Sequence, residues 1–320
     1  MSGGFDRNTR NKVVRLQTLT KPTGGGITTL ELPKTGFLAR LWLRINATAS
    51  GTITSPNPLG ASSIIRRVRL STNSGIDIFS VSGPGYAYLL DELLESEFHR
   101  GQSQNEGRTA VSAASFNLDM VIPVQVNLRD PIGLVMLQNE QLQVILTVDW
   151  EADANVGTGA TVTATCDPYL EYYTVPIDPE DYPPLNVIHQ IQEDTMLVAG
   201  AGDTIYNVLR GATYLQMAHG LGIGVSGADG FSRCVLRMNQ SDTIYDVTPD
   251  FLTMQSRLLR GRARVPGTIP FDFMASSGLG TYGLPRDLIN SALVTDFQSV
   301  ITATGAGTLY TLRRMLLPLG

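Results

Sequence analysis

The chain has 320 residues, and a chain of this length can form two cores of about 150 residues each. Hydrophobic residues make up 42% of the sequence and charged residues only 17%, which excludes a disordered chain and suits large neutral contact surfaces. The net charge of −5 excludes a protein that coats nucleic acid along its whole surface.

The N-terminal region is the locally basic part of the chain. It contains Arg7, Arg10, Lys12 and Arg15, and a glycine run at residues 24–26 favours a hinge behind it. Two interpretations stay open: a solvated flexible tail, or an arm that contacts phosphates or a neighbouring subunit. No apolar stretch follows these charges and no run of about 18 apolar residues occurs, so we expect synthesis in a cytosol without a signal peptide or membrane span.

Alternation of apolar and polar residues predicts β-strands along most of the chain. Residues 37–49 are the clearest case, because every second residue from Phe37 to Ile45 is apolar and lies on one face, while Arg40 and Arg44 fall on the other. Further predicted strands are residues 115–126, 142–150, 169–175, 268–274, 297–304 and 308–319, and leading strands are expected at residues 15–19, 27–32 and 203–208.

Two segments have helical periodicity instead. The first follows Pro84 and places leucines on one face, so its acidic residues are expected on the solvent side; these are Asp91, Glu92, Glu95 and Glu97. The second follows Pro249, and Asp250 is expected to cap it. Its apolar residues are Phe251, Met254, Leu258 and Leu259.

Residues 175–186 contain four prolines and three acids and divide the chain into two parts. Since proline fixes φ and removes a hydrogen-bond donor, we expect an extended spacer here.

The two parts repeat the same features in the same order, which indicates an internal duplication. The aligned positions are Asn73, Ile78 and Val81 with Asn239, Ile244 and Val247, the Ile-Pro pairs 122–123 and 269–270, and residues 142–148 with 297–303. The repeat predicts an all-β fold of two tandem eight-stranded antiparallel jelly rolls, each with one short helix. The predicted boundaries are a basic arm at 1–25, a first jelly roll at 26–177, a Pro-rich linker at 178–186 and a second jelly roll at 187–320.

With two jelly rolls, a helix in each, a Pro-rich connection and a basic N-terminal segment, the chain resembles the double jelly-roll major capsid proteins. These proteins build the shells of tailless icosahedral bacteriophages and viruses in the tectivirus–adenovirus lineage. The resemblance is one of pattern over nearly the whole chain and rests on no diagnostic motif. It implies a structural protein, not an enzyme, that forms homotrimers. Six similar wedges then make a pseudo-hexameric capsomer that tiles an icosahedral shell.

The resemblance also implies partners and a location. The partners are other copies in the trimer and in neighbouring capsomers, together with penton and minor capsid proteins. The basic arm, through Arg7, Arg10, Lys12 and Arg15, would contact the inner surface, a neighbour, an internal membrane or the packaged genome. The location is the virion, after synthesis and assembly in the host cytoplasm, and no cofactor is implied.

Catalytic and metal-binding motifs are not recognisable in the sequence. The histidines His99, His189 and His219 are far apart and lack metal-ligand spacing. Cys166 and Cys234 lie in apolar-alternating stretches, so buried free thiols are expected. Residues 222–227 match G-x-G-x-x-G, but a strand pattern rather than a helix follows, which favours a turn.

Alternative functions stay open at this point. Residues 256–264 carry Arg257, Arg260, Arg262 and Arg264, which could contact nucleic acid or an acidic neighbouring subunit. A viral spike, tail or lectin-like β-sandwich would bind carbohydrate through clustered exposed aromatics, yet Trp42 and Trp150 both lie inside strand patterns. A β-sandwich hydrolase would need convergent histidines or carboxylates, and a penton or minor capsid protein is a further alternative within the viral class.

Overall fold

The computed structural model describes residues 5, 8–98, 105–126, 131–224, 228–261, 263–274 and 288–318. The chain divides into two compact units, which are considered separately below. Unit 1 comprises Met1–Tyr86, Gln104–Gln192 and Pro318–Gly320, and unit 2 comprises Ala87–Ser103 and Glu193–Leu317. The boundary after Gln192 lies beyond the predicted linker, and the helix that follows Pro84 is grouped with unit 2 rather than with the first jelly roll.

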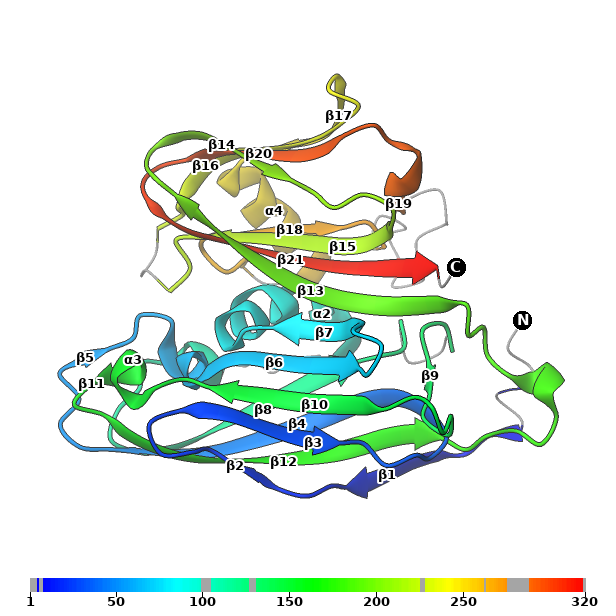
Figure 1. Cartoon of the computed structure of the whole chain (residues 1–320). Helices are drawn as coiled ribbons and strands as arrows, with labels where there is room; N and C mark the ends of the chain where they lie inside the picture. The colour runs from blue at the N-terminus through cyan, green and yellow to red at the C-terminus, as the bar shows by residue number, and fades with distance from the viewer. Residues whose placement is uncertain are drawn as a thin grey trace. The chain divides into compact units, whose positions relative to one another are not determined.

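Unit 1 contains two antiparallel sheets (Figure 1). The first sheet has the spatial order β1 (Asn11–Arg15), β12 (Thr161–Tyr173), β4 (Phe37–Ser50) and β8 (Ser115–Pro123), with β2 (Leu19–Thr20) also on β12 and β9 (Val135–Met136) on β4. The second has the order β3 (Gly26–Glu31), β10 (Val144–Trp150), β6 (Ile65–Thr72) and β7 (Asp77–Val81). Strands β5 (Ser55–Pro56) and β11 (Gly157–Thr158) form a separate pair, and the helical turns are η1 (Gly60–Ile64), η3 (Asn105–Arg108), α3 (Asp153–Val156) and η4 (Pro179–Asp181).

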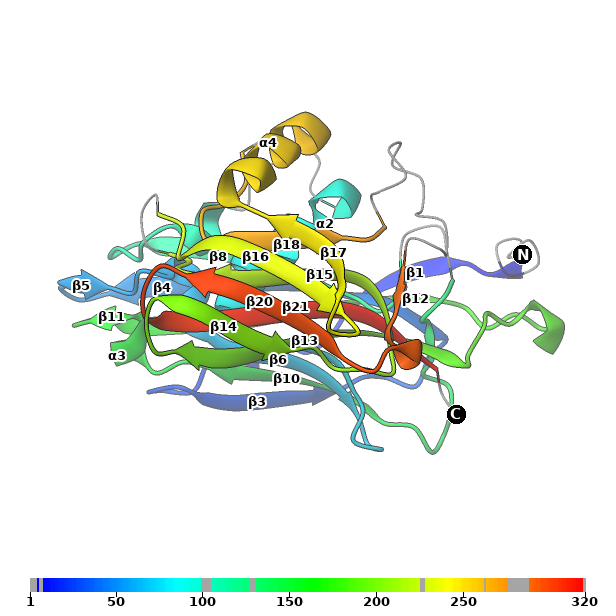
Figure 2. The same ribbon diagram turned by 90° about the horizontal axis from the view of Figure 1, so that it is seen from above.

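Unit 2 also contains two sheets, seen from above in Figure 2. One has the order β18 (Thr268–Asp272), β15 (Thr213–Leu221), β21 (Gly307–Pro318) and β13 (Val187–Val198), with β19 (Ile289–Asn290) also on β15. Strand β13 begins in unit 1, where Ile191 and Gln192 pair in parallel with β7. The other has the order β14 (Gly202–Asn207), β20 (Phe297–Ala303), β16 (Phe231–Met238) and β17 (Asp242–Val247). The helical segments are η2 (Gly85–Leu90), which begins in unit 1, α2 (Asp91–Phe98), α4 (Pro249–Arg260) and η7 (Ser291–Leu293).

The two units have the same strand topology. When the eight main strands of each unit are numbered along the chain, one sheet has the order 1-8-3-6 and the other 2-7-4-5 in both units. This arrangement is the double Greek key of a jelly roll. In chain order, one helix follows the fifth strand of each set of eight, since α2 lies between β7 and β8 and α4 between β17 and β18. The predicted fold, a tandem pair of eight-stranded jelly rolls with one short helix in each repeat, is confirmed.

Strand β4 shows why the alternating segments form half-buried strands. Its residues Leu41, Leu43 and Ile45 are buried, while Arg44 on the other face is exposed. Arg40 also lies on that outer face, but it is only 4% exposed. Its guanidinium is covered by neighbouring outer-face groups, so the outer face of β4 is not exposed along its whole length.

The helical segment after Pro84 is present, but Asp91 and Glu92 do not face solvent, and the side chains of Glu95 and Glu97 lie outside the described ones. Leu89, Leu90, Leu93 and Leu94 are buried as expected. Asp91 and Glu92 are buried too, at 4% and 1% exposure, which corrects the predicted solvent side. Within unit 2, Gln216 on β15 donates a hydrogen bond to the Leu93 carbonyl, so polar groups of the sheet reach the helix backbone.

The predicted helix after Pro249 is α4, and its cap differs from the expectation. Thr248, not Asp250, is the N-cap, because its hydroxyl accepts the Phe251 amide at 3.4 Å and Pro249 occupies the first turn. Gly261 ends the helix with φ of 69°, a left-handed conformation that glycine adopts without strain. Leu252 and Ser256 are buried, and the side chain of Leu259 lies outside the described ones.

The Pro-rich stretch is not an extended spacer throughout. Pro179–Asp181 forms a helical turn, and the Tyr182 ring packs edge-on against Phe37 with centroids 5.5 Å apart. Phe5 packs against the same Phe37 ring at 5.9 Å. The Pro-rich segment therefore contains a helical turn and packs on unit 1 through aromatic contacts.

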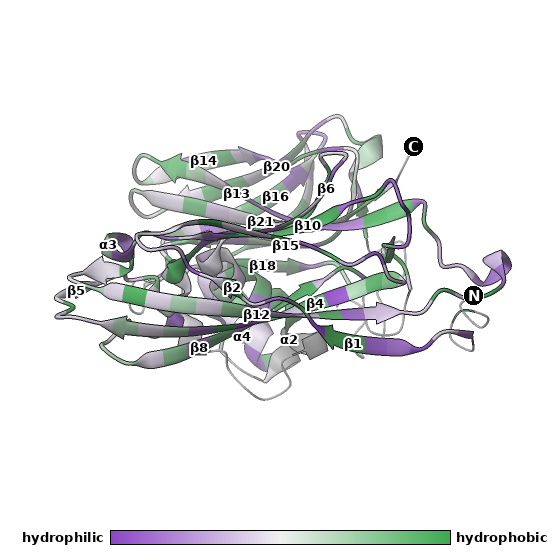
Figure 3. Ribbon diagram, turned by 60° about the horizontal axis from the view of Figure 1, so that its bottom comes forward, coloured by the Kyte–Doolittle hydropathy of each residue, from purple (hydrophilic) through white to green (hydrophobic). Residues whose placement is uncertain are grey.

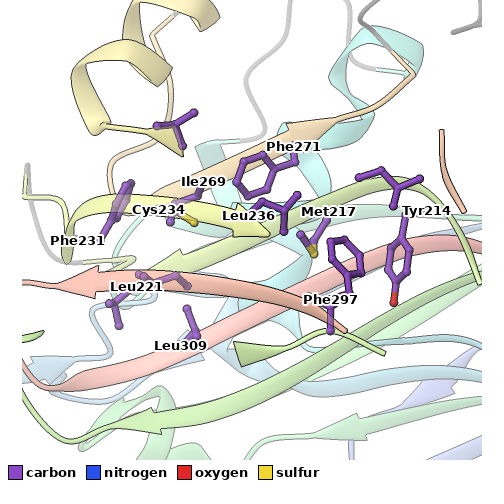
Figure 4. Packing of buried hydrophobic residues seen from close by; sticks show 14 of the residues in the cluster. Tyr214, Met217, Leu221, Phe231, Cys234, Leu236, Ile269, Phe271, Phe297 and Leu309 are labelled. Carbon is purple, nitrogen blue, oxygen red and sulfur yellow. The ribbon is translucent and has the colours of Figure 1, made fainter. Parts of the chain in front are cut away.

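The core of unit 2 lies between its two sheets. Figure 4 shows side chains from β15, β16, β18, β20 and β21 pointing toward one another, among them Met217, Leu236 and Phe271. No helix in the described part of the chain is long and apolar enough to cross a membrane.

Candidate functional site

The buried histidines of the described chain are structural. His219 on β15 makes hydrogen bonds from its two ring nitrogens to the Thr311 and Ser299 hydroxyls, at 2.9 and 2.8 Å. Burial, with Arg313 as a second cause, lowers the pKa of His219 to about 3, so the imidazole is neutral at physiological pH. His189 is buried, with Nδ1 3.1 Å from the Val124 carbonyl oxygen. His99 lies outside the described residues.

The cysteines and the glycine-rich motif also have structural explanations. Cys166 and Cys234 are buried free thiols, and burial raises the pKa of both, to about 12 for Cys166. Gly222 and Gly224 have positive φ in a turn after β15, and strand β16 follows, as predicted for a turn. These two strands belong to different sheets, so the turn crosses the sandwich. Within the described residues, no group of three or more metal-ligating side chains is assembled.

The basic N-terminal residues fall on the first strand of unit 1. Strand β1 pairs antiparallel with β12 and is the edge of its sheet, and Figure 3 shows hydrophilic colour on its N-terminal part, followed by hydrophobic colour. Lys12 and Arg15 lie on β1, and Arg10 precedes it with its amide donating to the Thr174 hydroxyl at 3.0 Å. All three are exposed, whereas Arg7 lies outside the described residues. The structure therefore holds the basic segment from Arg10 onward against the sheet.

Arg15 is engaged by a carboxylate of its own chain. Its guanidinium lies 2.8 Å from Asp167 on β12, and the Thr18 hydroxyl donates to the same carboxylate at 2.5 Å. The Thr18 hydrogen bond and then Arg15 hold the pKa of Asp167 below its usual value, while Asp167 raises the pKa of Arg15. Asn46 donates to the other Asp167 oxygen at 3.3 Å. Of the predicted contact residues, this leaves Arg10 and Lys12 as the described side chains with no ion pair.

A second carboxylate organises the same outer face. Glu171 on β12 accepts hydrogen bonds from Asn11 and from the Trp42 indole, each at 2.7 Å. Arg40 lies 3.5 Å from Glu171, and its guanidinium carbon is 5.9 Å from the Trp42 ring centroid. The sequence does not reveal this cluster, since its members come from three strands far apart in the chain.

The exposed apolar residues of α4 form a different kind of surface. Phe251, Met254 and Leu258 are 44%, 50% and 76% exposed, although they follow helical spacing. Arg257 is exposed beside them. In the alignment of the repeat, these residues occupy the positions of a core-facing helix, so the sequence gives no signal of their exposure.

A fold of two like jelly rolls in one chain, with buried histidines and no assembled metal site in the described residues, defines a double jelly-roll protein. No protein-family model and no curated protein matches the chain. Among solved structures, the STIV MCP, a major capsid protein, is similar with a TM-score of 0.74 and 14% identity, covering 97% of both chains.

Two further capsid structures have the same fold. The PBCV-1 virus capsid is similar with a TM-score of 0.66 and 10% identity, covering 96% of this chain and 94% of that one. The major capsid protein P2 from Bacteriophage PM2 is similar with a TM-score of 0.54 and 14% identity, covering 97% and 98%. At these identities the likeness is one of fold, and it extends over nearly the full length of the chain.

Proposed function

We propose that this chain is a structural capsid protein whose copies associate into the building blocks of an icosahedral viral shell. The observation that carries the proposal is the repetition of one jelly-roll topology in both units of a single chain. Neighbours with this fold over nearly their whole length are capsid proteins, and their role is structural rather than enzymatic.

The building block proposed here is a homotrimer. Three copies with two like domains each present six similar wedges, which approximate a hexagonal outline and can tile a flat facet. A closed ring of heterologous contacts satisfies this arrangement, because each copy uses one surface to bind the next copy and a second surface to accept the previous one. Assembly would take place in the host cytoplasm, and the product would reside in the virion with penton and minor capsid proteins.

The exposed residues Arg10 and Lys12 are proposed to contact the inner side of the shell. They flank the start of β1, and among described residues neither side chain is held by an acid of its own chain. A neighbouring subunit, an internal membrane or the packaged genome would each supply the negative charge that these two cations attract.

Mass measurement of the purified full-length chain tests the proposal. Analytical ultracentrifugation is expected to find a stable species near three times 34.6 kDa. Negative-stain images of that species are expected to show a hexagonal outline. A chain that stays monomeric over all accessible concentrations, and that binds immobilised glycans, would instead support the lectin-like alternative.

A further inference from the structure

Helix α4 exposes an apolar face that nothing in the described chain covers. Phe251, Met254 and Leu258 recur at i, i+3 and i+7, so they lie along one side of the helix. Leu258 is the most exposed, at 76%. The opposite side, with Leu252 and Ser256, is buried and provides the attachment to unit 2. Three large apolar side chains aligned on one exposed helix face indicate a contact surface.

This face has a basic end. Arg257 is exposed next to Leu258, and no hydrogen bond or ion pair engages its side chain within the described residues. The sequence continues with Arg260 and Arg262. Arg264, in contrast, is already committed, because its guanidinium lies 2.8 Å from Asp229 and is almost fully buried. The α4 surface thus combines an apolar stripe with at least one unneutralised cation, and a matching partner needs an apolar group beside acids.

Unit 1 carries a loop of that composition. Ile177 is 97% exposed, and the residues that follow it include the exposed acids Asp178 and Glu180. Asp181 accepts a hydrogen bond from Asn8 at 2.6 Å, but no described residue pairs with the side chains of Asp178 or Glu180. The turn at Pro179–Asp181 and the contact of Tyr182 with Phe37 hold the loop in place. The loop, residues 177–181, is therefore a fixed apolar and acidic projection.

We propose that the α4 face of one copy binds the loop at residues 177–181 of a second copy of this chain. Ile177 would pack against the apolar stripe, and Asp178 or Glu180 would face Arg257. The two surfaces differ in sign and shape and belong to different units, so the contact is heterologous and can close into a ring. This inference rests on the proposed self-association and identifies the surfaces that carry it.

The charge pattern selects a second copy over other occupants. A nucleic acid would bind the exposed cation but would leave the apolar stripe uncovered. An anionic lipid surface would bind Arg257 and the apolar stripe, but it would offer no partner to the acids Asp178 and Glu180. Every copy of the chain carries both the α4 surface and the loop at residues 177–181, so self-association gives each of these surfaces a partner.

Charge reversal tests the pairing. Arg257→Glu and Glu180→Arg are each expected to raise the trimer dissociation constant at least about tenfold, because like charges then face each other. The double variant is expected to return to within about threefold of the wild type, since the pair is restored with inverted sign. Analytical ultracentrifugation over a dilution series of the full chain measures all four proteins.

An apolar pair of variants provides the control. Leu258→Ser is expected to weaken the trimer, whereas Leu293→Ser, at a residue 85% exposed elsewhere in unit 2, is expected to leave it unchanged. Circular dichroism melts check that every variant is folded. A wild-type chain that never associates would refute the proposed function itself. A wild-type trimer that is insensitive to Arg257→Glu and Glu180→Arg, or a double variant as weak as the singles, would overturn this pairing alone.

Discussion

His219 shows how one residue can couple the two sheets of a jelly roll and make stability depend on pH. Its ring nitrogens bond to Thr311 on β21 and Ser299 on β20, and these strands belong to opposite sheets. The Tyr206 and Phe271 rings pack edge-on against it, with centroids at 5.8 and 6.1 Å. Neutral imidazole fits this site because one nitrogen donates and the other accepts.

The free energy of unfolding is expected to fall as the pH decreases from 6.5 toward 3. The pKa of His219 drops from 6.5 to about 3 on folding, so the unfolded chain binds the extra proton in this window. The resulting slope is about 1.4 kcal/mol per pH unit at most. Urea unfolding at a series of pH values gives the free energy of unfolding against pH. The slope of this plot should be shallower in His219→Gln than in the wild type, by up to about 1.4 kcal/mol per pH unit. Equal slopes would show that His219 does not carry this dependence.

Glu171 is expected to stabilise unit 1 far more than an exposed carboxylate does. Removing it takes the acceptor from the Asn11 amide and the Trp42 indole and one carboxylate from beside the buried Arg40 guanidinium, and losses of this kind cost about 3 kcal/mol. Urea unfolding of Glu171→Ala measures this loss. Asp119→Ala is the matched control, because the Asp119–Arg44 pair spans 4.0 Å between side chains more than half exposed. Its cost should stay under about 1 kcal/mol, and similar losses in both variants would contradict the role given to Glu171.

At the scale of elements, helix α4 depends on a cap that lies before the residue expected from sequence. Thr248→Ala is expected to lower the free energy of unfolding by about 1 kcal/mol, because the Phe251 amide loses its acceptor. Asp250→Ala should cost only about 0.5 kcal/mol, through the helix dipole. Hydrogen exchange at the Phe251 amide should accelerate only in Thr248→Ala. The reverse ranking would restore Asp250 as the cap.

The elements also show where sequence reasoning reaches its limit. Strands such as β4 were predictable because apolar and polar residues alternate along them, and both helices were predictable from apolar spacing after a proline. This periodicity does not show whether protein or solvent covers the face opposite the apolar one. Asp91 and Glu92 are buried although they are charged, and Phe251 and Leu258 are exposed although they have the spacing of core residues. Solvent exposure is set by tertiary packing, which a local pattern does not contain.

At the scale of the molecule, the repeat was predictable because the two halves keep the same order of strands, helix and Ile-Pro pairs although few of their residues are identical. The Ile-Pro pairs fall at the ends or middles of β8 and β18, the sixth strands of the two units, and the matched segments 142–148 and 297–303 fall on their seventh strands, β10 and β20. The assignment of residues 11–20 was less readable. Val13 and Val14 are 58% and 45% exposed at a sheet edge, so β1 lacks the alternating burial that identifies inner strands. The Glu171 cluster was not readable, since it joins three strands that only the fold brings together.

The position of β1 leads to a prediction about complete shells. Strand pairing holds β1 on the sheet through its backbone, so reversing the exposed side chains of Arg10 and Lys12 should leave the fold and the trimer mass unchanged. The combined variant Arg10→Glu, Lys12→Glu is expected to lose the attraction to anionic groups inside the shell, and the yield of closed particles should fall at least about tenfold in electron micrographs.

The matched control for that variant reverses two other exposed cations of unit 1, with Lys34→Glu and Arg44→Glu, and so makes the same change in net charge. If both combinations reduce the particle yield equally, the loss reflects net charge and the arm has no particular role. If only the Arg10 and Lys12 combination reduces it, and added salt reduces the wild-type yield in the same way, the contact is electrostatic and belongs to the N-terminal segment. Such a result would separate the two tasks of this chain, because the trimer would depend on α4 and on residues 177–181, and the closure of the shell on the charges at the start of β1.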